Sequence, residues 1–335
     1  MAAPVDPPVP AGQAQDGHAV ALKDYLRISA LSRRDLTLLL DLSEELKRDP
    51  HRYSGLLRNE VVAMDFTKPS TRTRVSFTVA IARLGGTPEM LGPADLQLGR
   101  GETIEDTARV LSRYVKAFVI RTFADDEVAR FAAASTIPVI NALTDGHHPC
   151  QALADLLTIR EKLGRLEGVR VAFVGDGCNT VHSLMEAAAL GGMQIIVATP
   201  PGYEADAKVV ETARSIALQN RSSVETTHDV RVAVTGADVV YTDVWLSMNV
   251  DASEKDARVK AFSPYRITDE LMGLTETGSI FMHCLPAHRG EEVTPQVIDG
   301  FRSVVFDQAE NRLCTEQAIL VALLTGRLEG AGRWA

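Results

Sequence analysis

A short polar run at residues 68–74 (KPSTRTR) carries the residue types needed to hold a phosphate group. It follows the apolar run 61–66 and precedes a helix-like apolar pattern, so it is predicted to lie at a strand-to-helix junction. The first turn of a helix offers free backbone N–H groups and the positive end of the helix dipole. Arg72 and Arg74 add guanidinium donors that match phosphate oxygens. An ordinary capped helix with two solvated arginines explains this run about equally well, and its neighbours must decide.

Two further stretches supply groups that fit the same kind of site. Arg121 ends the apolar run 117–120, and His148 and Gln151 lie three residues apart at the start of a helix that Pro149 opens. A helix N-terminus disfavours the imidazolium form, so His148 is predicted to be neutral and able to donate to a carbonyl oxygen. For a single histidine before a helix, a surface role without function would be the usual reading. The companion arginines and Gln151 favour a binding role.

The run at 175–179 (GDGCN) follows an apolar strand pattern and opens a helix, as in dinucleotide-binding proteins. Thr180 stands where that fingerprint has its third glycine, and no acidic residue follows the next strand. A dehydrogenase is therefore weakly supported. The glycines and Asn179 indicate instead a close approach of the chain to a small ligand.

Three later positions add a carboxylate, a thiol and a further cation. Asp243 ends a strand and could pair with a substrate ammonium, although a solvated loop aspartate is about as common. Cys284 suggests a nucleophile, but no Asn or Asp lies near it in the sequence to orient it, so this reading is not compelling. Leu285 and the proline after it predict a turn whose carbonyls could accept from a ligand NH2 group. Arg312, near the last predicted helix, could complete an anion site.

The composition of the 335 residues, 45% hydrophobic and 24% charged, is that of a soluble globular protein with room for two domains. A net charge of −9 argues against nucleic acid or an anionic membrane as partner. The four cysteines are widely spaced without a CxxC pair, which predicts reduced thiols, no metal site and no cofactor. With no signal peptide and no apolar run of spanning length, we expect a cytoplasmic protein.

Alternating strand and helix patterns predict an α/β fold of two doubly wound parallel-sheet domains joined by long helices. The predicted strands are 61–66, 117–121, 138–142, 169–175, 194–198, 223–227, 239–242, 279–283 and 304–307. The predicted limits are a disordered tail at 1–18, a first domain at 19–149, a second domain at 150–314 that the linking helix enters, and a C-terminal helix at 315–335 that packs back on the first domain. Most of the polar stretches follow predicted strands, so we expect them in one cleft between the domains.

Together these stretches resemble the transcarbamylase family, and within it the ornithine carbamoyltransferases, from about residue 22 to 326. The stretches that carry the resemblance are KPSTRTRVSF at 68–77, DTARVLSRY at 106–114, HHPCQALADLLTI at 147–159, GDGCN at 175–179, DVWLSM at 243–248, MHCLPAHRGEEV at 282–293 and AENR at 309–312. The resemblance implies transfer of a carbamoyl group from carbamoyl phosphate to L-ornithine or a related amine, giving citrulline as in arginine biosynthesis. It also implies a homotrimer with shared active sites and neither metal nor cofactor.

The resemblance also implies roles for individual residues. The residues implied for carbamoyl phosphate are Ser70, Thr71, Arg72, Thr73, Gln97 (from a neighbouring subunit), Arg121, His148, Gln151, Cys284, Leu285 and Arg312. Those implied for the amino acid are Asn179, Asp243, Ser247 and Met248. Among these, a catalytic role is implied for Arg72, Arg121, His148, Asp243 and Cys284.

Three positions depart from the family's usual residues: Cys178 stands for Asn, Asn249 for Gly and Thr67 for Glu. The first two border the expected amine pocket, so a different amine or amino acid is the first alternative substrate. A non-catalytic paralogue is an alternative of another class; the loss of Arg72, Arg121 or His148 would have indicated it, and all three are present. A nucleotide-binding oxidoreductase is the third alternative.

Overall fold

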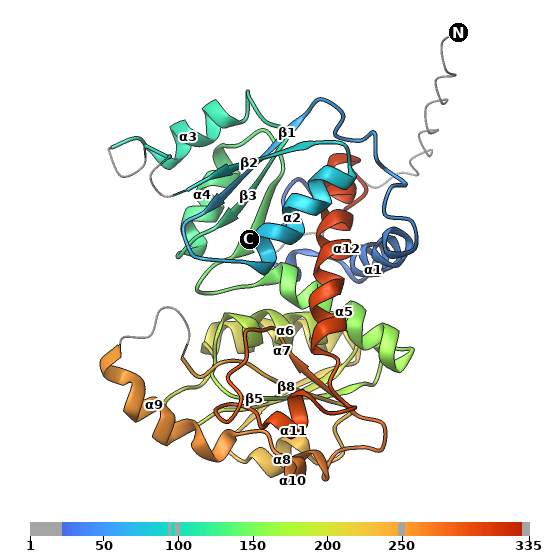
Figure 1. Ribbon diagram of the computed structural model, residues 1–335, viewed down its shortest axis with the longest axis vertical. Helices are drawn as coiled ribbons and strands as arrows, with labels where there is room; N and C mark the ends of the chain where they lie inside the picture. The colour runs from blue at the N-terminus through green and yellow to red at the C-terminus, as the bar shows by residue number, and fades with distance from the viewer. Residues whose placement is uncertain (1–21, 93–94, 98–100, 247–251, 330–335) are drawn as a thin grey trace.

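The computed structural model describes residues 22–92, 95–97, 101–246 and 252–329, and these form two parallel sheets (Figure 1). The first sheet has the order β2-β1-β3-β4 and the second the order β7-β6-β5-β8-β9. The strands are β1 (Val61–Phe66), β2 (Thr87–Leu91), β3 (Ala117–Arg121), β4 (Val139–Leu143), β5 (Arg170–Val174), β6 (Gln194–Ala198), β7 (Ser223–Thr227), β8 (Val239–Thr242) and β9 (Ile280–His283). The predicted α/β class with two parallel sheets is confirmed.

Each sheet reverses its strand order next to its first strand. β1 pairs in parallel with β2 on one side and β3 on the other, and β5 pairs in the same way with β6 and β8. In doubly wound sheets such a reversal opens a crevice at the carboxyl ends of the strands, where ligands bind. Both sheets therefore offer a crevice to the same region of the molecule.

Helices connect the strands and cover the sheets (Figure 1). They are α1 (Arg33–Arg48), α2 (Arg72–Arg83), α3 (Ile104–Leu111), α4 (Asp125–Ala134), α5 (Pro149–Leu163), α6 (Asn179–Gly191), α7 (Ala207–Asn220), α8 (Val230–Val234), α9 (Lys255–Phe262), α10 (Asp269–Met272), α11 (Pro295–Ile298) and α12 (Val305–Leu324). None of the helices in these described ranges has the combined length and apolar character that a membrane crossing requires.

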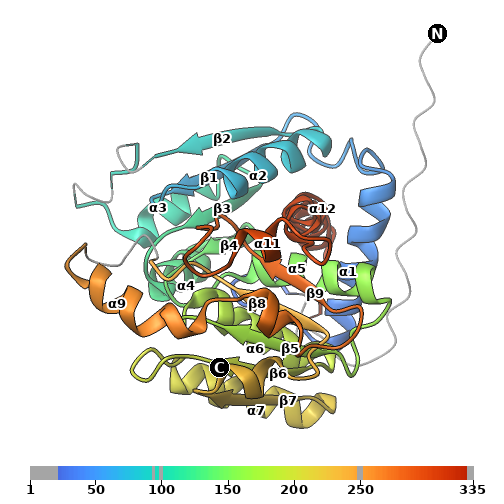
Figure 2. The same cartoon turned by 60° about the horizontal axis from the view of Figure 1, so that its bottom comes forward.

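Helices α5 and α12 tie the two sheets together. α5 leads from β4 of the first sheet to β5 of the second, and α12 returns from the second half to pack against α1, α2 and α5 (Figures 1 and 2). Figure 2 views α12 almost end-on beside α2 and α1. One apolar core runs through this region and contains Met64 of β1, Phe173 of β5 and Leu320 of α12. The long helices thus set the position of one sheet against the other.

Two strand predictions were wrong, for different reasons. β2 was missed: it is a half-exposed edge strand containing Pro88, and proline is tolerated in a strand mainly at such an edge. The predicted strand at 304–307 is the start of α12, because a short apolar run cannot be assigned to strand or helix by its pattern alone. The last helix therefore begins at Val305 and not at residue 315. The tail predicted at 1–18 lies outside the described residues, and the domain limits stay a prediction.

Candidate active site

A cavity of about 590 Å³ lies at the carboxyl ends of strands from both sheets. Its lining residues come from the ends of β3 and β4, from the segments that follow β1, β4, β5, β8 and β9, and from α2, α5, α6 and α12. Twelve of the predicted site residues line it: Ser70, Thr71, Arg72, Thr73, Arg121, His148, Gln151, Asn179, Asp243, Cys284, Leu285 and Arg312. Gln97 is exposed and does not line it. Ser247 and Met248 lie outside the described residues.

The loop between β1 and α2 forms one wall of the cavity. Thr71 occupies the N-cap of α2 in a helical conformation, and its side chain makes no capping hydrogen bond. Arg72 Nη2 instead donates to the carbonyl oxygen of Leu285 at 2.5 Å, and Thr73 Oγ1 accepts from Arg312 Nη2 at 3.0 Å. These bonds hold the loop against the end of β9 and against α12.

Three guanidinium groups share this end of the cavity. Burial, together with the charges of Arg312 and Arg72, lowers the pKa of Arg121 to about 10. Burial also lowers the pKa of Arg72. Arg121 Nε is buried and has no hydrogen-bond partner within the part of the chain that the structure describes. Like charges held together in a poorly solvated place favour an anionic ligand, which would pair with them.

His148 is neutral at this cationic end. Burial lowers its pKa well below the usual value for histidine, and the charges of Arg312, Arg121 and Arg72 act in the same direction. The lowered pKa agrees with the predicted neutrality, and burial is its largest cause. His148 Nδ1 is buried without a hydrogen-bond partner among the described residues. This imidazole can therefore hydrogen-bond a ligand oxygen without adding another charge.

A carboxylate and two thiols form another part of the cavity wall. Asp243 accepts from Cys284 Sγ at 3.0 Å, from Cys178 Sγ at 3.7 Å and from the backbone N–H of Val244 at 2.8 Å. Burial, together with the charge of Asp243, raises the pKa of both thiols far above the usual range. An acidic neighbour of Cys284 therefore exists, contrary to the expectation from sequence spacing. It keeps the thiol protonated, so a thiolate nucleophile is not supported.

The loop after β5 does not use its glycines as predicted. A Cβ at Gly177 would lie 2.3 Å from the backbone of Glu204 and Ala205, so this glycine permits close packing between two loops. Asn179 begins α6 and lines the cavity, and its Nδ2 donates to the carbonyl oxygen of Thr144 at 2.5 Å. Among these residues, Asn179 rather than Gly177 faces the cavity.

Sequence reasoning assigned no role to several residues that support the site. Lys68 and Asp145 line the cavity as an ion pair, and the Lys68 Nζ lies 4.5 Å from the centre of the Phe123 ring. Asp155 and Gln308 are fully buried behind the lining. Asp155 is four residues after Gln151, a spacing that places both on one face of α5. This spacing could have indicated from the sequence that Asp155 contacts Gln151.

Two candidate cation clusters touch the cavity. One, formed by His288, Glu291 and Glu292, reaches it through the exposed His288, and the other contains Asp243 and Cys284. Donor atoms of Asp243, His283 and Cys284 lie within 4.8 Å of one another. His283 Nε2 donates to Glu292 Oε1 at 3.1 Å, and its Nδ1 accepts from the backbone N–H of Leu285 at 2.9 Å. Both ring nitrogens are thus engaged, so a cation there would have to displace existing hydrogen bonds.

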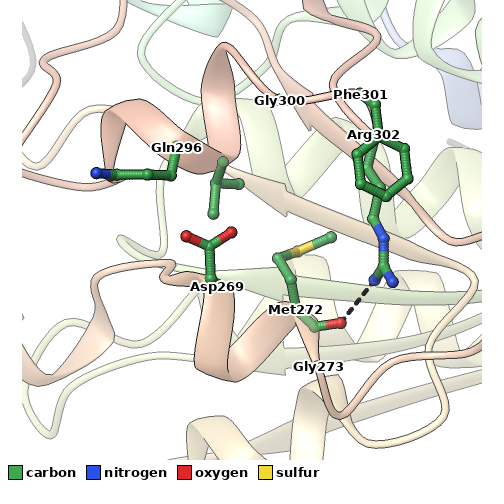
Figure 3. Close-up of a pocket in the computed structure, with 8 residues that line it drawn as sticks. Asp269, Met272, Gly273, Gln296, Gly300, Phe301 and Arg302 are labelled. Carbon is green, nitrogen blue, oxygen red and sulfur yellow. Dashed lines mark hydrogen bonds between the residues drawn. The ribbon is translucent and has the colours of Figure 1, made fainter.

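A second cavity, of about 220 Å³, contains none of the predicted site residues (Figure 3). Asp269, Met272 and Phe301 are among the residues that line it, and Arg302 donates to the carbonyl oxygen of Met272 at 2.7 Å (Figure 3). Arg302, which lines this cavity, already donates to a main-chain carbonyl group. The larger cavity is therefore the candidate active site.

His147, the residue before His148, belongs to a buried group of opposite charges. Its Nδ1 lies 2.7 Å from Asp125 Oδ2 and its Nε2 lies 3.8 Å from Glu186 Oε1. Burial alone would lower the pKa of His147, but Asp125 and Glu186 outweigh it and raise the pKa. Despite its own burial, Asp125 has its pKa lowered to about 2, chiefly by His147. This group joins the start of α4, the loop before α5 and α6 directly behind His148.

Two family models match the chain. Residues 23–161 match the aspartate/ornithine carbamoyltransferase, carbamoyl-P binding domain. Residues 167–323 match the aspartate/ornithine carbamoyltransferase, Asp/Orn binding domain. The two matches divide the chain between the two sheets, within α5 and the turn that follows it.

Curated relatives and solved structures agree with these matches. The ornithine carbamoyltransferase of Parafrankia sp. is 52% identical over 313 residues, which cover 92% of this chain and 98% of the relative. That of Bacillus subtilis is 50% identical over 90% of this chain and 94% of the relative. The structure of ornithine carbamoyltransferase from Pyrococcus furiosus is 49% identical, with a TM-score of 0.86, and covers 90% of this chain and 96% of that one.

A solved structure named for a different amine is more distant. The structure of an N-acetyl-L-ornithine transcarbamylase mutant is 30% identical, with a TM-score of 0.82, and covers 90% of this chain and all of that one. Backbone similarity is thus almost equal between the two kinds of relative. The two solved structures differ more in their sequence identity to this chain, which is 49% for the first and 30% for the second.

The His147 group predicts how stability depends on pH. Because the pKa of His147 is raised, the stabilisation that its charge provides is complete below the usual histidine pKa of about 6.5. It is lost as pH rises through the higher pKa of the folded state. His147→Gln removes the charge, so the free energy of urea unfolding should differ from wild type more at about pH 5.5 than at about pH 9.

The exposed His51 provides a matched control, since His51→Gln makes the same change where the structure shows no such group. Its difference from wild type should not depend on pH in this way. A difference for His147→Gln that stays constant, or grows toward high pH, would contradict the assignment of a charged His147.

Proposed function

Because the chain belongs to the aspartate/ornithine carbamoyltransferase family, we propose that it transfers the carbamoyl group of carbamoyl phosphate to the side-chain amine of L-ornithine, giving L-citrulline and phosphate. The observation that carries the proposal is the polarity of the cavity. Three arginines and a neutral histidine line it together with Asp243 and two protonated thiols, so it offers groups for an anion and for a cation. A substrate pair with a phosphate at one end and an ammonium at the other fits that arrangement.

The phosphate half of the proposal rests on the loop before α2. Ser70, Thr71, Arg72 and Thr73 line the cavity, and the backbone N–H groups of the first turn are free of intrahelical partners. We assign the phosphate to this loop and to Arg121. Arg121 bridges the phosphate and the carbamoyl carbonyl oxygen, because its Nε lacks a partner among the described residues and its charge is poorly solvated. Binding of a dianion there would relieve the repulsion among the guanidinium groups.

The carbamoyl group lies between donors and acceptors. His148 and Thr73 polarise the carbonyl oxygen, on which negative charge grows as the amine attacks. Gln151 and the carbonyl oxygens of Cys284 and Leu285 accept from the NH2 group, and Arg312 holds Gln151 in place through a 2.8 Å hydrogen bond. These partners fix the orientation of the group before the reaction starts.

The reaction needs positioning more than covalent chemistry. The ornithine ammonium must first lose a proton; the amine then attacks the carbamoyl carbon, and the C–O bond to phosphate breaks. A second proton leaves the attacking nitrogen, and the departing phosphate gains negative charge next to the arginines. Holding two reactants in line and meeting the developing charge with preorganised donors supplies most of the acceleration in such a transfer.

The amine half rests on Asn179 and Asp243, with Ser247 and Met248 assigned from the family resemblance. The Asp243 carboxylate offers an oxygen to the substrate nitrogen beside Cys284 Sγ. Relatives named for ornithine are 35–52% identical, against 30% for the solved structure named for N-acetyl-L-ornithine. That difference favours ornithine although Cys178 and Asn249 depart from the usual residues.

We also infer a homotrimer in which Gln97 reaches the phosphate of a neighbouring subunit. The exposure of Gln97, outside the cavity of its own chain, supports this role. Sedimentation of the purified protein should give a mass three times that of the chain. A monomer that turns over at full rate would contradict the shared site.

The proposed function is tested by product identification. Purified protein is incubated with carbamoyl phosphate and ornithine, lysine, putrescine, N-acetylornithine or aspartate, and both phosphate release and the ureido product are measured. We expect citrulline from ornithine to dominate by roughly a hundredfold, since an amine of another length or with another substituent would misplace the attacking nitrogen by about 1 Å or more. Cys178→Asn, which restores the family's usual residue, should keep this preference.

Preference for another amine would mean that Cys178 and Asn249 have changed the specificity of the amine end. Absence of turnover with every amine would overturn the proposal and favour a non-catalytic paralogue.

Arg72→Ala tests the phosphate half separately. The change removes one of the clustered cations and the hydrogen bond to Leu285, so binding of carbamoyl phosphate should fall by at least about a hundredfold. Calorimetric titration measures this loss, and circular dichroism checks that the variant is folded. Arg74→Ala is the matched control, because Arg74 lies on the same helix, is exposed and does not line the cavity. Normal binding by Arg72→Ala would disprove the assignment of the phosphate site.

A further inference from the structure

A buried carboxylate lies directly behind the cavity without lining it. Asp155, on α5, is fully buried, and its Oδ1 accepts two amide hydrogen bonds. One comes from Gln151 Nε2 at 2.8 Å and the other from Gln308 Nε2 at 2.7 Å. We call Gln308, Asp155 and Gln151 the amide relay. The relay connects α12 of the C-terminal half with the cavity wall on α5.

A main-chain group fixes the direction of the relay. The backbone N–H of His283, at the end of β9, donates to Gln308 Oε1 at 2.9 Å. A backbone N–H can only donate, so the oxygen of this glutamine must face β9 and its NH2 group must face Asp155. Asp155 in turn has to present an acceptor oxygen to Gln308.

The same oxygen then determines which way Gln151 is turned. Gln151 donates its NH2 group to Asp155 and accepts from Arg312 Nη1 at 2.8 Å through its own oxygen. A rotated amide would place two acceptors together at Asp155 and two donors together at Arg312. Both contacts would then be repulsive in a buried place. Gln151 therefore has a single favourable orientation.

We propose that Asp155 is a positioning residue for recognition of the carbamoyl group: it keeps the oxygen of Gln151 turned toward the cavity, so that the site accepts an NH2 group and discriminates against a methyl group in the same position. The inference rests on the proposed function, since it concerns how the site recognises the carbamoyl group of that substrate. Leu285, the other main acceptor, lies two residues after His283. Hydrogen bonds to His283, at the end of β9, therefore help to position both acceptors.

The relay holds in either charge state of Asp155. Burial raises the pKa of Asp155 to about 7, against the lowering effect of its hydrogen bonds and of Arg312. Its second oxygen, Oδ2, is buried without a hydrogen-bond partner among the described residues, and the neighbouring titratable group is the hydroxyl of Tyr241, which accepts from Gln308 Nε2 at 3.0 Å. A proton would therefore be placed on Oδ2, and Oδ1 would remain the acceptor for both amides. The orientation of Gln151 does not require an ionised Asp155.

The test compares three ligands that share a phosphate end. Binding of carbamoyl phosphate, acetyl phosphate and inorganic phosphate is measured by calorimetry without any amine, for wild type and for Asp155→Leu. Acetyl phosphate carries a methyl group where carbamoyl phosphate carries NH2. In Asp155→Leu the acceptor is gone, so the ratio of the affinities for carbamoyl and acetyl phosphate should be about tenfold smaller than in wild type. That change corresponds to about one hydrogen bond. Binding of inorganic phosphate should stay within about twofold of wild type.

Asp155→Asn is the conservative rescue, because an amide oxygen can still accept from both glutamines, and it should keep most of the preference. Thr158→Val is the matched control: Thr158 is equally buried on α5 and bonded to Ala154 and Asn311, outside the relay. It should leave the preference unchanged. If Asp155→Leu does not fold, Asp155→Ala takes its place in the same comparison.

An unchanged preference in the Asp155 variant that folds would overturn the inference. So would an equal loss of all three ligands, which would indicate a general structural defect. Failure of wild type to bind carbamoyl phosphate would instead contradict the proposed function, so the two failures are distinguishable.

Discussion

The site depends most on the buried side chain of Arg312. Its guanidinium group donates to Glu316 on its own helix, to Gln151 on α5 and to Thr73 on α2. The first of these partners neutralises the charge, and the other two join three helices at the wall of the cavity. Burial on its own would lower the pKa of Arg312, but Glu316 outweighs it and the pKa is raised. The residues proposed to bind the carbamoyl group are arranged around this one guanidinium group.

Such an arrangement favours ligand binding at the expense of stability. Arg72 and Arg121 lie near Arg312 in a poorly solvated place, which lowers the pKa of each, whereas Arg312 has Glu316. Buried charges without full compensation destabilise a folded protein, and active sites commonly retain such strain because it is relieved by the substrate. The cationic end therefore exists before the ligand arrives. A phosphate that enters finds donors already in place and need not reorganise them.

The sequence indicated much of this site because its residues lie where strands end. Arg121 ends a buried strand, and Asp243 and Cys284 each follow one. Parallel sheets bring such positions together at one edge, independently of the connecting loops. His148 was predicted to be neutral from its place before a helix, and the structure adds that burial is the largest cause of its lowered pKa. Eight of the nine predicted strands exist, since buried parallel strands have clear apolar runs.

Other features depend on contacts between distant segments. The nearness of Asp243 to Cys284 spans 41 positions, and that of Gln308 to Asp155 spans 153, so local patterns carried no trace of either. Gly177 looked like a ligand-binding glycine, but packing of a later loop accounts for it. The edge strand β2 and the start of α12 were misread because half-exposed or short apolar runs fit more than one structure.

The central claim is that the arginine end of the cavity is a preformed site for the phosphate of carbamoyl phosphate. Urea unfolding at about 25 °C, with carbamoyl phosphate against sodium chloride of equal ionic strength, tests it most directly. A ligand that binds the folded state alone should raise the free energy of unfolding by about 2.7 kcal/mol at a hundred times its Kd, rising with the logarithm of concentration. The account predicts this rise for carbamoyl phosphate and a smaller one for inorganic phosphate. No rise beyond that of the salt control would contradict it.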